Sequence, residues 1–211
     1  MTAIFEELFI LALDEEEGEI PKSVEEKMEP ILAGAVLAEL LLHHRIELRD
    51  DRIVVQDQTP TENPILDISL FEILESSKPR KLRYWINTLV HSKIIEEIGH
   101  DLVRQEILVR KKKHLWMASP QGNGTNGKVS LQSNLKNKID RIVTDGYDTE
   151  LPDKALLAIL YYGDLLKLVY KHRDRKEARK RIKTIVQPED GAAVLGGSLD
   201  EIIATACEII V

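Results

Sequence analysis

The segment from Ile31 to Leu42 is apolar on nearly every side, and it limits what this chain can fold into more than any other feature. A helix without a polar face has to be enclosed, because no orientation gives it a surface suited to water. The segment is much shorter than the roughly 18 apolar residues that cross a bilayer. It therefore predicts a helix buried at the centre of a protein, and the polar residues His43 to Arg45 mark its end.

The rest of the chain shows mostly helical periodicity. Ala155 to Tyr170 is a second segment apolar enough to be central, with Asp153 as its N-cap, and Ser198 forms a capping box with Glu201 for the last helix. Two short β-hairpins are expected at Ile46 to Val55 and at Ile107 to Met117, with Arg110 to His114 as the second turn. Further helices are expected at 5–12, 65–75, 80–90, 94–105, 131–143 and 171–183.

These elements predict a mainly α fold in which residues 1–211 form a single compact helical domain. Central buried helices and two short β-hairpins make up that domain, and a length of 211 residues suits one domain. The single cysteine, Cys207, allows no intramolecular disulfide and is expected to be a small core residue on a helix. Glu6 and Glu7 stand where a signal peptide would be basic, so no signal peptide is expected.

The net charge of −7 is unevenly distributed along the chain. Residues 1–29 hold ten acidic and two basic groups, whereas the remainder carries a net charge of +1. Exposed charges act over only about 8–10 Å in physiological salt, so local clusters matter more than the total. An acidic chain of this kind can therefore still have an anionic partner.

The sequence offers little support for catalysis. Gly122 to Gly127 fits G-x-G-x-x-G, but it follows a short hairpin rather than a buried strand, and a surface turn explains it better. The histidines and the cysteine lack zinc-ligand spacing. Glu39, inside the apolar helix, is either a buried carboxylate with a raised pKa or, as we favour, the partner of a neighbouring cation or of solvent. We expect no enzyme, no metal site and no cofactor.

Three clusters of basic residues remain, of which Arg110 to Lys113 is the most informative. Lys78 to Arg83 contribute four cations, and Lys171 to Lys183 contribute eight cations with two acids. Arg110, Lys111, Lys112 and Lys113 stand together at a predicted hairpin tip, and Leu115 and Trp116 follow them. Cations attract anionic lipid headgroups, and an indole prefers the boundary between water and lipid. The alternative, that Trp116 packs inward as a strand residue, stays open.

Several of these segments resemble the Golgi phosphoprotein 3 family. LFILALDEEEG at Leu8 to Gly18 is similar to the family's opening LLLGLKDKEG-type helix. GAVLAELLLHHRIEL at Gly34 to Leu48 resembles its G-x-x-L-x-E-L-x-L-x-x-R-I/L-x-L pattern, and TPTENPILDISL at Thr59 to Leu70 resembles A-P-T-G-x-x-L-L-D-E-A-L. Trp85-Ile86 matches a Trp-Ile of the following helix. The resemblance, to a bacterial-type member, covers most of the chain.

The resemblance implies a helical, non-enzymatic adaptor that binds phosphatidylinositol 4-phosphate in Golgi membranes and recruits glycosyltransferase tails. It also implies that the hairpin at Ile107 to Met117 supports membrane association and oligomerisation. Family members surround the headgroup with an indole and several arginines. Those positions fall at the uncharged residues Val24, Ala33, Ser92 and Ile95 here. Lys93, close by, can replace them only as a point charge, so we expect less selective binding to anionic lipid.

The main hypothesis is a cytoplasmic, peripheral membrane protein whose lipid-binding residues are Lys93 and Arg110 to Lys113. Leu115 and Trp116 would contact the membrane, with a protein client and a second copy of the chain as further partners. The alternative is a winged-helix-like nucleic-acid binder, with Ile46 to Val55 as the wing and Lys171 to Lys183 on the phosphates.

Overall fold

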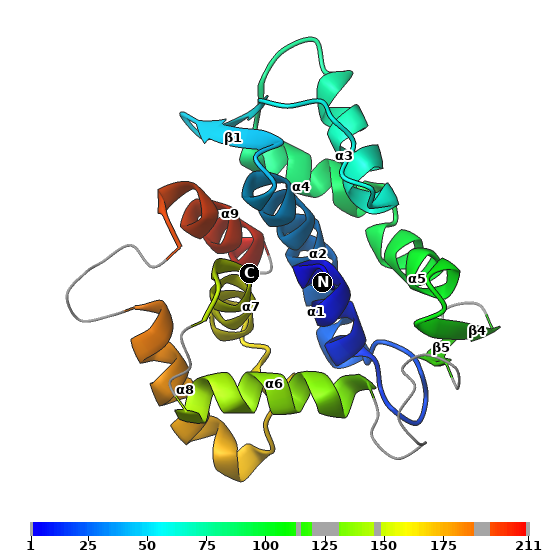
Figure 1. The fold of residues 1–211 in the computed structure, drawn as a ribbon, viewed down its shortest axis with the longest axis vertical. Helices are drawn as coiled ribbons and strands as arrows, with labels where there is room; N and C mark the ends of the chain where they lie inside the picture. The colour runs from blue at the N-terminus through cyan, green and yellow to red at the C-terminus, as the bar shows by residue number, and fades with distance from the viewer. Residues whose placement is uncertain (1, 113–114, 120–130, 146–148, 188–194, 210–211) are drawn as a thin grey trace.

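The computed structural model describes residues 2–112, 115–119, 131–145, 149–187 and 195–209. Within these ranges the chain is mainly helical, which confirms the predicted fold class (Figure 1). The helices are α1 Ile4–Ala12, α2 Lys22–Leu42, α3 Pro64–Leu74, α4 Leu82–His91, α5 Ile94–Arg104, α6 Leu131–Asp145, α7 Leu151–Tyr162, α8 His172–Val186 and α9 Gly197–Glu208, with a 3-10 turn, η1, at Leu166–Leu168. The strands are β1 Ile46–Arg49, β2 Arg52–Val55, β3 Arg80–Lys81, β4 Leu108–Lys112 and β5 Leu115–Ala118.

Helix α2 is the centre of the structure, as its sequence predicts. Every residue from Pro30 to Leu40 is buried. Helices α1, α3, α4, α5 and α9 all pack against α2 (Figure 1). Helix α1 lies beside it, and all the residues of α1 are buried as well. The two central helices therefore need most of the other elements as cover, and this need sets the arrangement of the fold.

The first hairpin is confirmed and acquires a third strand. Strands β1 and β2 pair antiparallel from Ile46 with Val55 to Arg49 with Arg52, and β3 adds to the other edge of β2. The turn residues Asp50 and Asp51 both have positive φ angles, of 48° and 60°. Such a turn suits the right-handed twist of a hairpin, and Asp tolerates it better than most residues. Strand β3 is too short to leave a periodic signal in the sequence.

Three predicted details in the C-terminal half are wrong. The helix expected from Ala155 to Tyr170 ends at Tyr162, because Asp164 turns the chain with a φ of 53° and a 3-10 turn follows. Asp153 lies inside α7 and binds Lys138 Nζ at 2.7 Å, whereas Glu150 takes the N-cap position. The capping box at the last helix is also wrong, because α9 begins one residue before Ser198 with Gly196 as its N-cap.

Gly34 shows how closely the helices around α2 approach it. A Cβ atom at Gly34 would overlap the Cβ of Ala206 on α9, which packs extensively along α2. Both positions are buried, so neither backbone can move without disturbing the core. Small residues on both helices permit this crossing.

We expect Gly34→Ala to lower the free energy of unfolding by about 1–3 kcal/mol, because overpacking outweighs the gain in helix propensity. The double variant Gly34→Ala/Ala206→Gly should recover most of the loss by returning the space. Gly197→Ala is the matched control, since a Cβ there meets nothing within 4 Å. Urea unfolding of the variants measures these differences, and a Gly34→Ala protein as stable as the Gly197→Ala protein would contradict the proposed contact.

Candidate functional site

The second hairpin, β4–β5, carries the cations singled out in the sequence. Leu108 pairs with Ala118 and Lys112 with Leu115, and the register shifts between Arg110 and Lys112. Arg110, Lys111 and Lys112 are therefore strand residues rather than turn residues, which corrects the predicted turn. Lys113 and His114, between the two strands, lie outside the described residues, as does the segment from Gly122 to Gly127.

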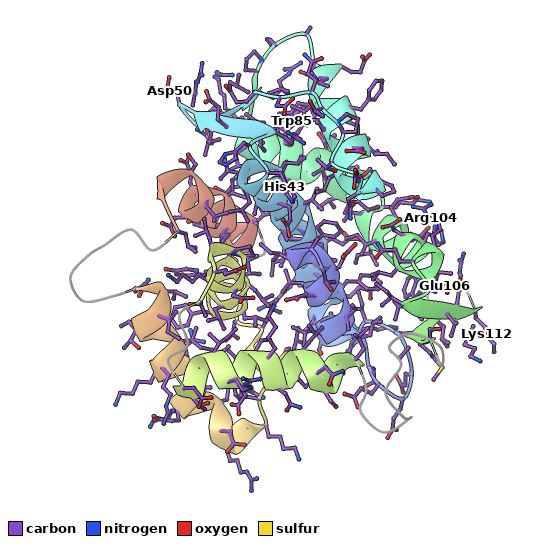
Figure 2. All side chains as sticks on the ribbon, in the orientation of Figure 1. His43, Asp50, Trp85, Arg104, Glu106 and Lys112 are labelled. Atoms are coloured by element: carbon purple, nitrogen blue, oxygen red, sulfur yellow. The ribbon has the colours of Figure 1, made fainter. Side chains whose placement is uncertain are left out.

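The hairpin presents its cations to solvent. Arg110, Lys111 and Lys112 are all exposed, and Figure 2 shows Lys112 at the outer edge of the molecule. The register shift lets three consecutive side chains avoid the interior, because an irregular strand re-aims its residues. Arg110 Nη1 lies 2.8 Å from His100 Nε2 on α5. Within the described part of the chain, no carboxylate forms an ion pair with Lys111 or Lys112.

Trp116 lies on the inner side of the same hairpin. Only 2 % of its surface is exposed, and its ring meets Phe9 of α1 edge-to-face, with 5.4 Å between the ring centroids. The expectation that Trp116 contacts a membrane is therefore wrong in this conformation, and the inward-packing alternative is correct. Leu115, its neighbour, is half-buried.

Two glycines that the sequence did not assign to the site hold Trp116 in place. A Cβ on Gly99 of α5 would lie 2.5–2.8 Å from three atoms of the indole, so only glycine lets the ring lie flat there. Gly18 accepts the Trp116 backbone N–H at 2.7 Å and has a φ of +69°. The hairpin is thereby joined to α1, to α5 and to the turn after α1.

The structure does not bring Lys93 to the hairpin. Lys93 is an exposed residue with a φ of 60° between α4 and α5. The hairpin follows the opposite end of α5, a helix of 11 residues that is about 16 Å long. Lys93 and the hairpin cations therefore do not form one pocket.

A comparison with family models shows to which protein family the chain belongs. The model for Golgi phosphoprotein 3 (GPP34) matches residues 4–205. The chain belongs to the Golgi phosphoprotein 3 family. The match covers every helix described above apart from the last residues of α9, and it includes the whole β4–β5 hairpin.

In this family member, the positions that the resemblance assigns to headgroup binding are mostly internal. Val24 is 2 % exposed and Ala33 is fully buried on α2. Ser92 is exposed, but its hydroxyl donates to the Leu89 carbonyl at 2.7 Å. Ile95 packs partly against the core. These four residues offer no cation to a phosphate. No helix of the described residues is both long enough and apolar enough to cross a bilayer.

An acidic turn adjoins the hairpin of this family member. The Asp14 carboxylate accepts the backbone N–H groups of Glu16 and Glu17, and these bonds lower the pKa of Asp14. Glu15 to Glu17 and Glu19 are exposed, and the turn meets β5 through Gly18. Lys136 of α6 binds Glu15 at 3.2 Å. Within the described residues, the acids of this turn form no ion pair with Arg110, Lys111 or Lys112, although the turn contacts the strand that follows them.

Glu39 is a buried carboxylate, which is the less favoured of the two possibilities that the sequence left open. It is 5 % exposed, and its carboxylate accepts the N–H of Ile4 at the start of α1. Burial raises its pKa, against the lowering effects of that hydrogen bond and of His43 Nε2 at 3.6 Å. Ala3 has no side chain suited to capping, so Glu39 performs the N-cap role from another helix. This structural role explains why α2 buries a carboxylate, and no catalytic role is needed to explain it.

Glu39 makes a pH dependence predictable. Because the folded pKa is raised above 4.5, the unfolded chain loses its proton first as pH rises, and the contribution of Glu39 to stability falls from about pH 4.5 upwards. Glu39→Gln keeps an acceptor for Ile4 but removes the charge. As the pH rises from 4.5 to 7, we expect the urea midpoint of the variant to increase relative to that of the unmodified protein. Burial also raises the pKa of Glu7, and the Glu39 charge raises it further, so Glu39→Gln lowers the pKa of Glu7 and changes the midpoint in the same direction. A difference between the two urea midpoints that stays constant across this pH range would refute this account.

Proposed function

We propose that this protein is a non-enzymatic, peripheral membrane-associating adaptor that binds anionic phospholipid headgroups through the β4–β5 hairpin. The observation that carries the proposal is the row of exposed cations at Arg110, Lys111 and Lys112, with Lys113 following in the sequence. Membership of the Golgi phosphoprotein 3 family supports the same class of function. The protein acts on the cytoplasmic side of the membrane as a single domain.

The proposed contact is electrostatic and weakly selective. Each cation near an anionic surface contributes about 1 kcal/mol, and lysine acts as a point charge rather than as a bidentate fork. The uncharged residues at Val24 and Ala33 support the view that no phosphate is enclosed. Phosphatidylinositol 4-phosphate, the lipid implied by the family resemblance, would then be bound for its charge. A protein client and a second copy of the chain, meeting at the hairpin, complete the proposed partners.

The arrangement of the other basic elements argues against the nucleic-acid alternative. The β1–β2 hairpin and α8 lie towards opposite ends of the long axis of the molecule (Figure 1). A wing and a phosphate-binding helix would have to reach one duplex together. Two of the cations at the first hairpin also have acidic partners, because Arg49 binds Glu47 and Lys81 binds Asp51.

Removal of three hairpin lysines tests the proposal. We expect Lys111→Gln/Lys112→Gln/Lys113→Gln to weaken binding to vesicles rich in phosphatidylserine by at least tenfold, since three charges near the surface contribute about 3 kcal/mol at low salt. The matched control is Lys176→Gln/Lys180→Gln/Lys183→Gln, which removes the same charge from exposed positions on α8. Vesicle sedimentation at several salt concentrations measures both variants. Equal binding to neutral and acidic vesicles, or an equal loss in the control, would exclude the hairpin mechanism.

Tryptophan fluorescence tests the orientation of the hairpin. Both tryptophans of the chain, Trp85 and Trp116, are at most 3 % exposed, so we expect vesicles to leave their emission unchanged. In Leu115→Trp a third indole stands at a half-exposed position beside the cations, and its emission should shift to shorter wavelength on binding. A shift of the emission to shorter wavelength in the unmodified protein would show instead that Trp116 leaves its buried position when the protein binds the membrane.

A further inference from the structure

Helices α3 and α4 lie towards the end of the molecule that carries the β1–β2 hairpin, and both expose large apolar side chains (Figure 1). Ile68 and Phe71 on α3 are 54 % and 62 % exposed, and Tyr84 on α4 is 47 % exposed. They are three of the five large apolar residues that are exposed among the described residues. Apolar side chains that gather on one part of a surface mark a site of interaction.

The exposed residues of α3 lie opposite its buried side. The buried side consists of Ile65, Leu66, Ser69, Leu70 and Ile73. Helical periodicity places Ile68, Phe71 and Glu75 on the other side. Helix α3 is therefore apolar on its outer side as well as on its inner side, and a helix of this kind is normally enclosed. Its outer side has no cover in the described part of the chain.

Phe71 and Tyr84 stand near the two helix ends that residues 75–81 join. Helix α3 ends three residues after Phe71, and α4 begins two residues before Tyr84. Leu74 at the end of α3 and Trp85 on α4 line the same hollow, so the two helix ends are neighbours. The two exposed aromatic residues therefore belong to one region of the surface.

Charges of opposite sign flank these apolar residues. Glu72 and Glu75 lie on the α3 side, where the helix contains no cation. Lys78 and Arg83 are exposed on the α4 side, where the first helical turn contains no acid. Within the described residues none of these four side chains forms an ion pair, and Glu72 Oε2 is buried without a hydrogen-bond partner. The region thus has an apolar centre, an acidic side and a basic side.

Such a surface is complementary to itself. A two-fold axis through it brings the acidic side of each copy to the basic side of the other, and it makes every contact twice. Exposed aromatic residues are the usual anchors of such interfaces. We propose that a second copy of this chain docks here, with Phe71 against the partner's Tyr84 and Glu75 facing the partner's Arg83.

This interface leaves the cations of the β4–β5 hairpin uncovered. Helix α4 precedes the N-terminal end of α5, whereas the hairpin follows its C-terminal end, about 16 Å away. The inference goes beyond the proposed function, because it is a contact between copies separate from the one at the hairpin and needs no lipid. Two copies joined in this way would carry two hairpins in one assembly.

Sedimentation equilibrium of the unmodified protein and its variants tests the apolar centre. We expect the unmodified protein to dimerise, and Phe71→Ser to raise the dissociation constant of the dimer at least roughly tenfold, because an aromatic anchor is lost twice. Phe71 is exposed, so the fold should be kept. Leu151→Ser is the matched control, since Leu151 is 39 % exposed on α7. It should dimerise as the unmodified protein does, and so should Lys111→Gln/Lys112→Gln/Lys113→Gln.

Reversal of the charges tests the two-fold arrangement. Glu75→Lys and Arg83→Glu should each weaken the dimer several-fold, because like charges then face each other at both contacts. An equal mixture of these two variants should form a heterodimer as tight as the unmodified dimer, because each contact again joins opposite charges. A pair formed within one chain would not be restored by mixing.

Several results would overturn the assignment. They are a protein that stays monomeric at every concentration, an equal effect of Phe71→Ser and Leu151→Ser, and a mixture of the charge variants that fails to associate. An association lost only in the triple lysine variant would also overturn it, and would leave the hairpin contact of the proposed function in place. A monomer whose binding to acidic vesicles falls with Phe71→Ser would assign this face to lipid instead of to a second copy.

Discussion

The enclosure of α2 is the constraint on which the rest of the structure depends. Its residues from Pro30 to Leu40 are all buried, so neighbours have to cover every side of the helix. Helix α1 is itself wholly buried and cannot serve as an outer layer. The remaining helices therefore pack around a pair of central helices rather than around one. Glu39 joins the pair, because the carboxylate that α2 buries is the one that caps α1.

The sequence predicted those parts of the fold that depend on local pattern. The central helix could be predicted because a continuous apolar segment of this length is seldom stable unless it is buried. The first hairpin could be predicted because two short apolar segments flank polar turn residues. The end of α7 was not readable, since apolar residues continue beyond Tyr162 and the break is made by the backbone at Asp164. Apolar pattern reports burial, and it does not distinguish a helix from the buried turn that follows it.

The composition of the candidate site can be read from the sequence, but its geometry cannot. The row of cations at Arg110 to Lys113 is visible in the sequence, whereas the direction of Trp116 is not, because a shift of one residue in a strand exchanges its two faces. The residues that decide the direction are Gly18 and Gly99, which contact Trp116 from another turn and another helix. A single glycine in a sequence gives no indication of which distant ring will lie against it.

The buried tryptophan changes how the hairpin would work at a membrane. An inserted indole would add binding energy, whereas a buried one fixes the strand that carries the cations and leaves attraction to charge alone. The exposed acids Glu15 to Glu17 would reduce that attraction, since they belong to the turn that meets β5 through Gly18. A contact of this kind is weak, reversible and sensitive to salt. Stable attachment would therefore require a second simultaneous contact, because linked weak sites bind far more tightly than either site alone. In the proposed function, a second copy of the chain or a protein client would supply such a contact. The buried position of Trp116 would keep the cations directed at the lipid while that contact forms.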